Sequence, residues 1–101
     1  MTERLMPFDA SRYIDSDAAA VVFLEDAMES GNASVIAAAI GDVAKFRGMS
    51  AIAKETGMSR ESLYRALSGD GNPQLSTVLK VLEAMGLKLT VEPASKTSSA
   101  A

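Results

Sequence analysis

The chain of 101 residues contains no cysteine, no histidine and no tryptophan. Without cysteine and histidine it cannot build a disulfide framework, a zinc finger, a cysteine nucleophile or an imidazole base. Its clustered carboxylates fall on expected helices, where caps and solvated side chains explain them better than general acids and bases. We therefore expect a binding protein and no enzyme, with no metal, no cofactor and no small-molecule substrate.

Long apolar runs are also missing from the sequence. No uninterrupted run approaches the roughly 20 residues that span a membrane, and the N-terminus MTERLMPFDA has an acid and a proline where a signal peptide is apolar. With 48% hydrophobic and 23% charged residues, the chain is nevertheless too apolar to remain unfolded. We expect one small cytoplasmic domain with no membrane partner.

The apolar residues recur at spacings of three and four, which predicts helices. Glycines and polar caps divide the pattern into five helices, over residues 17–30, 34–47, 51–56, 60–68 and 75–85. In the first, second and last helices the side chains expected to face the core are Val21, Leu24, Ala27, Met28, Val35, Ile36, Ala39, Ile40, Val43, Phe46, Leu75, Val78, Leu79 and Leu82.

A different pattern follows the last helix. Leu87, Leu89 and Val91 alternate with polar residues, and this period of two predicts a half-buried strand over residues 87–92. The chain offers no second convincing strand, so we expect the segment to pair with its copy across a dimer. The expected organisation is an N-terminal arm (1–16), a domain (17–92) in which Leu87, Leu89 and Val91 are dimer contacts, and a disordered tail (93–101).

The third and fourth expected helices have the spacing of a helix-turn-helix. Ala53 is small enough for two helices to cross closely, Gly57 permits a tight turn, and Ser59 caps the following helix. Leu63 packs inward. Ser50 is expected to cap the earlier helix.

The remaining side chains of this unit point away from the expected core. They lie on the surface that contacts base edges and phosphates in a helix-turn-helix protein. Arginine can pair with guanine, while serine and tyrosine can bond phosphates or bases. The predicted DNA contacts are Ser50, Lys54, Ser59, Arg60, Glu61, Ser62, Tyr64 and Arg65.

The formal net charge of −3 and the pI near 4.8 are unusual for a nucleic-acid binder. The charge is unevenly distributed, however. Residues 1–32 hold two basic and seven acidic side chains, a net −5, whereas residues 45–65 hold five basic and two acidic side chains, a net +3. We expect the basic segment to face DNA and the acidic one to face a basic protein partner, although an ordinary solvated helix face would carry the same acids.

The sequence from Phe8 to Glu92 resembles the addiction-module antidote proteins, HigA-type antitoxins with a phage-repressor-like helix-turn-helix. The string GMSAIAKETGMSRESLYRALSGDGNP is its most specific part, and the preceding FDASRYIDSDAAA is typical of this family rather than of repressors in general. The resemblance implies an all-α, five-helix DNA-binding domain that acts as a homodimer. It also implies repression of its own operon through double-stranded operator DNA, and neutralisation of a RelE/HigB-like ribonuclease toxin.

Two alternatives share the helix-turn-helix pattern. A stand-alone transcriptional repressor would have no toxin partner, and an adaptor would have lost DNA binding and kept only protein contacts.

One departure from the phage-repressor pattern concerns the glutamine that often bonds a phosphate near the start of the first motif helix. Met49 and Ser50 stand in that region here, with Ser50 as a substitute donor.

Overall fold

Five α-helices make up the regular structure of the chain as far as it is described. The computed structural model describes residues 16–70 and 72–94, so the expected arm up to residue 15 and the tail from residue 95 lie outside the described residues. The helices are α1 (Asp17–Glu29), α2 (Ala33–Arg47), α3 (Met49–Thr56), α4 (Arg60–Ala66) and α5 (Leu75–Ala84). The prediction of five helices is confirmed, and each bound lies within two residues of the expected one.

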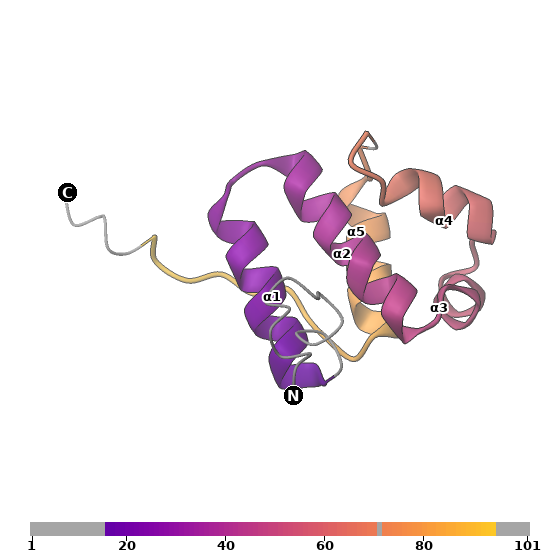
Figure 1. Cartoon of the computed structure of the whole chain (residues 1–101), viewed down its shortest axis with the longest axis horizontal. Coiled ribbons are helices and arrows are strands. Elements are labelled where there is room, and N and C mark those ends of the chain that lie inside the picture. Colours follow the sequence, from indigo (N-terminus) through magenta and orange to yellow (C-terminus); the bar gives the residue numbers. More distant parts are fainter. Residues whose placement is uncertain (1–15, 71, 95–101) are drawn as a thin grey trace, which may run out of the picture.

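The helices surround α2. Figure 1 shows α1 on one side of α2, α3 and α4 on the other side, and α5 behind. Among the described residues, no helix is long and apolar enough to cross a bilayer.

Side-chain caps define where the first two helices begin. The Ser16 hydroxyl accepts a hydrogen bond from the Ala19 N–H at 3.1 Å. The Asn32 side chain accepts from the N–H groups of Ser34 and Val35 at 2.8 and 3.2 Å. These bonds satisfy N–H groups of the first turn that have no partner within the helix.

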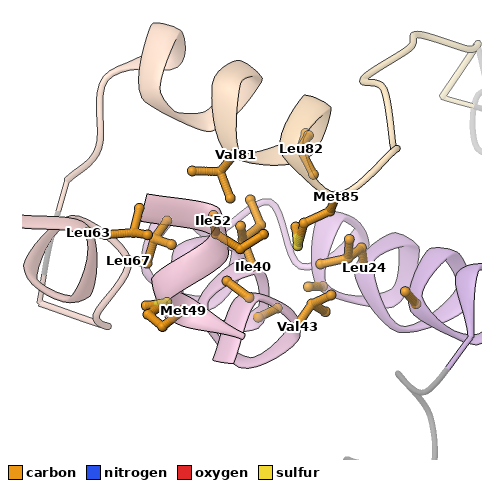
Figure 2. Packing of buried hydrophobic residues seen from close by; sticks show 14 of the residues in the cluster. Leu24, Ile40, Val43, Met49, Ile52, Leu63, Leu67, Val81, Leu82 and Met85 are labelled. Atoms are coloured by element: carbon orange, nitrogen blue, oxygen red, sulfur yellow. The ribbon is translucent and has the colours of Figure 1, made fainter. Parts of the chain in front are cut away.

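One continuous core joins all five helices. Figure 2 shows it from close by: Leu24 comes from α1, Ile40 and Val43 from α2, Met49 and Ile52 from α3, Leu63 from α4, and Val81 and Leu82 from α5. Ile40, Val43, Leu63 and Val81 are the largest side chains that are fully buried. Helix α4 is therefore fixed to the centre of the molecule through Leu63.

Five of the side chains expected in the core are exposed. They are Val21, Val35, Phe46, Leu75 and Leu79, with exposed fractions between 40 and 64%. Positions one or two residues away, including Ala20, Ala37, Ala44 and Val81, are buried instead. Alanine on the contact side lets two helices pack at short distance, and the larger residues at the edge of each apolar stripe then fall outside the contact.

The expected strand over residues 87–92 is wrong: residues 87–94 have no regular secondary structure. Gly86 has a left-handed φ of 77°, its N–H donates to the Glu83 carbonyl at 2.9 Å, and the Leu87 N–H donates to the Leu82 carbonyl at 2.8 Å. This is the Schellman arrangement that ends a helix. Leu87 therefore belongs to the end of α5 and packs against the core, and residues 16–70 and 72–94 supply no partner strand for a ladder.

One close backbone contact occurs where α2 meets the end of α4. A Cβ atom built on Gly41 would lie 2.7 Å from the Leu67 carbonyl oxygen and 3.2 Å from the Leu67 Cβ. Real Cβ atoms do not approach a backbone oxygen so closely, so only glycine allows α4 to dock in this position.

We expect Gly41→Ala to lower the free energy of unfolding by about 1–3 kcal/mol, because the new methyl group pushes the end of α4 away. Helix propensity alone predicts the opposite sign, since alanine is favoured over glycine by about 1 kcal/mol. Urea denaturation measures the difference. Gly69→Ala is the control, because nothing lies within 4 Å of its Cβ position. A Gly41→Ala protein that is as stable as the original chain or more stable would contradict the close contact.

Candidate nucleic-acid interface

A three-residue turn joins α3 to α4 and sets their relative orientation. Gly57 has a φ of 76°, in the left-handed region that side chains disfavour. The Gly57 N–H donates to the Lys54 carbonyl at 3.3 Å, and the Met58 N–H donates to the Ala53 carbonyl at 3.1 Å. These two bonds again form a Schellman end. The predicted role of Gly57 is confirmed.

The beginning of α4 is stabilised by its own cap. The Ser59 hydroxyl accepts a hydrogen bond from the Ser62 N–H at 3.0 Å, as the sequence predicts. The inner face of α4 is held by Leu63, and Leu67 directly after the helix is buried as well. The middle of α4 and the residue directly after its last turn are therefore packed into the core, and the outer face of the helix is presented on this support.

The outer face of α4 carries most of the predicted DNA contacts. Arg60, Glu61 and Arg65 are exposed, and Tyr64 is 40% exposed. Ser62 is half-buried, and its N–H is engaged by the cap. Ser50 and Lys54 are exposed on α3, one helix away.

Tyr64 brings two cations from different helices together. The Arg60 Cζ lies 5.8 Å from the centre of the Tyr64 ring, and the Lys45 Nζ, from α2, lies 5.9 Å from it. Both distances fall within the range of a cation–π attraction. Lys45 belongs to the basic segment in the sequence but is missing from the predicted DNA contacts, because only the packing of α2 against α3 and α4 places it beside this surface.

Ser50 does not have the expected capping role. Helix α3 begins at Met49, two residues earlier than predicted, with Gly48 at the cap position and no side-chain cap bond. Met49 is 4% exposed and forms part of the core, which extends the helix backwards over its first turn. Ser50 consequently lies inside that turn with an exposed side chain.

One cation of the basic segment is used by the fold. The Arg47 guanidinium bonds the Asp17 carboxylate at 2.9 Å and the Met85 carbonyl at 3.1 Å. It therefore ties the end of α2 to the start of α1 and the end of α5. The cations that remain on the surface of segment 45–65 are Lys45, Lys54, Arg60 and Arg65.

Comparison with known proteins identifies one family. A family model described as "probable addiction module antidote protein" matches residues 4–93. The chain is also similar to an uncharacterized protein of Haemophilus influenzae, with 42% identity over 92 residues that cover 91% of this chain and 95% of the relative. No solved structure matches the chain.

The contribution of the Ser59 cap to the free energy of unfolding can be measured by comparison with Ser50, an exposed serine in the first turn of α3. We expect Ser59→Ala to lower the free energy of unfolding by about 1 kcal/mol, because the Ser62 N–H loses its acceptor. Ser50→Ala should change it by less than about 0.5 kcal/mol, as is usual for an exposed substitution. Parallel thermal and urea unfolding of the two variants provides the comparison, and equal effects would contradict the assignment of the cap.

Proposed function

The chain belongs to the family of probable addiction module antidote proteins, and from this we propose that it is the antitoxin of a type II toxin–antitoxin module. In this proposal it binds and neutralises a RelE/HigB-like ribonuclease toxin and represses its own operon as a DNA-binding homodimer. It acts in the cytoplasm, without catalysis and without a cofactor.

The observation that supports DNA binding is the cationic outer face of α4 on a rigid support. Leu63 is fully buried beneath the helix, so the helix can enter a major groove without moving relative to α2 and α3. Arg60 and Arg65 then reach bases or phosphates. Tyr64 restrains Arg60 and Lys45 before DNA arrives, which reduces the side-chain entropy lost on binding.

The homodimer places two copies of α4 in successive major grooves, about 34–36 Å apart along the DNA. The subunit contacts that the sequence predicts include Leu89 and Val91, which are 42 and 92% exposed and therefore accessible to a partner. Leu87 contributes less than expected to such a contact, because it packs against the core of its own chain.

We expect Lys45→Ala and Arg60→Ala each to weaken binding to a duplex that covers the DNA upstream of the gene. Each variant should reduce the slope of log affinity against log salt by about one, because one phosphate contact is lost. Fluorescence anisotropy at several salt concentrations measures both quantities. Lys88→Ala is the matched control. It removes the same charge from the C-terminal segment (residues 87–94), which Figure 1 shows on the side of α2 away from α4. Unchanged slopes, or an equal loss for Lys88→Ala, would contradict this interface.

Toxin neutralisation is tested by co-expression with the protein encoded by the neighbouring gene. We expect that protein alone to arrest growth, and the chain to restore growth and to co-purify with it. The double variant Arg60→Ala/Arg65→Ala should still restore growth while it no longer protects the upstream DNA in a footprint. A harmless neighbour that does not co-purify, together with a wild-type footprint, would favour the stand-alone repressor.

A further inference from the structure

An open groove runs along α1 on the side of the molecule away from α4. The C-terminal segment after α5 forms its second wall, and Leu82 of α5 also lines it. Its volume is about 560 Å³. Figure 1 shows that α2 separates this side of the molecule from α4. Binding in the groove would therefore leave the outer face of α4 free.

The walls of the groove expose apolar side chains that a monomer would normally bury. Val21 of α1 is 40% exposed, and Leu89 and Val91 on the opposite wall are 42 and 92% exposed. Leu24 and Met28 line the groove more deeply. An apolar surface gathered in a concave site, with a polar rim, is characteristic of a protein interaction site.

The rim of the groove is acidic. Glu25 and Glu29 of α1 and Glu92 of the C-terminal segment line it, against a single cation, Lys88. These three carboxylates form no ion pair with a cation of the described residues. Residues 16–44 contain no lysine or arginine, so the charged side chains of α1 itself are all acidic.

We propose that this groove is the docking site for the cognate toxin, and that it takes a toxin segment with apolar side chains flanked by lysine or arginine. The inference rests on the proposed antitoxin function and identifies the surface that binds the toxin. The apolar side chains of the segment fill the space between Val21, Leu89 and Val91. Its cations meet Glu25 and Glu29, which steer the two proteins together and fix the register of the segment.

Charge argues against a second copy of this chain as the occupant. A two-fold contact is made by the same surface on both subunits. Across this groove it would bring together two rims that each carry three glutamates against the single cation Lys88. Like charges brought together at an interface disfavour the complex. A basic partner removes this repulsion, and we assign Leu89 and Val91 to that partner.

Two adjacent valines of α1 provide a matched pair for the test. Val21 lines the groove, whereas Val22 is 62% exposed and does not line it. We expect Val21→Arg to raise the Kd for the neighbouring gene's protein at least about tenfold, because arginine fills the groove and repels a cationic segment. Val22→Arg should change the Kd by less than about twofold, as contacts outside an interface core usually do. Titration of the full-length chain on the immobilised partner measures both values.

The acidic rim is tested separately by Glu29→Lys and Asp26→Lys. Both substitutions change the charge by the same amount on an exposed position of α1, but only Glu29 lines the groove. We expect Glu29→Lys to weaken toxin binding and Asp26→Lys to have a smaller effect. All four variants should bind the upstream DNA as the original chain does, which shows that they are folded.

The outcomes separate the groove from the proposed function. If the original chain does not bind the neighbouring protein, the antitoxin function fails. If the original chain binds it and Val21→Arg and Glu29→Lys bind equally well, only the groove assignment is overturned. A variant that loses its homodimer in light scattering but keeps toxin binding also overturns it, because the groove then holds a second copy. Loss of toxin binding with the homodimer and DNA binding intact is the expected result.

Discussion

The orientation of α4 depends on the absence of a side chain at Gly41. The backbone of α2 at this point lies so close to the Leu67 carbonyl oxygen that a Cβ atom on residue 41 would be only 2.7 Å from it. Ile40 and Val43, on either side in the sequence, are fully buried, as is Leu63 from α4. The close contact at Leu67 and the burial of Leu63 therefore hold α4 at its end and at its middle, and the exposed face of α4 takes its direction from a buried point on another helix.

The same central helix separates two surfaces of opposite charge. On one side, Tyr64 holds Arg60 and Lys45 near one aromatic ring. On the other side, Glu25 and Glu29 line an apolar groove. Arg47 is the exception among the cations, because it pairs with Asp17 and bonds the end of α5. Its charge thus serves to connect three helices and is not available on the basic surface.

The local elements were predictable because their causes are local. Gly57 ends α3 and Ser59 caps α4 through backbone geometry and bonds within a few residues, and these signals are visible in the sequence. Predictions that depended on distant contacts were less successful. Val21 and Phe46 fit an apolar stripe but are exposed, because neighbouring helices cover only part of each stripe. The alternation after Gly86 resembled a strand, but Leu87 is held by the end of α5.

The sequence by itself determined the helices, their order, the turn between α3 and α4, and the division of charge between the two halves of the chain. These properties follow from spacing, caps and counts along the chain, which need no knowledge of what lies nearby. Only the tertiary structure decided that Lys45 joins Arg60 at Tyr64, that Arg47 is withdrawn from the basic surface, and that α1 and the C-terminal segment enclose a groove. Each of these pairs residues from different helices or segments, and such pairings are set by how the helices pack and not by the order of residues in any one of them.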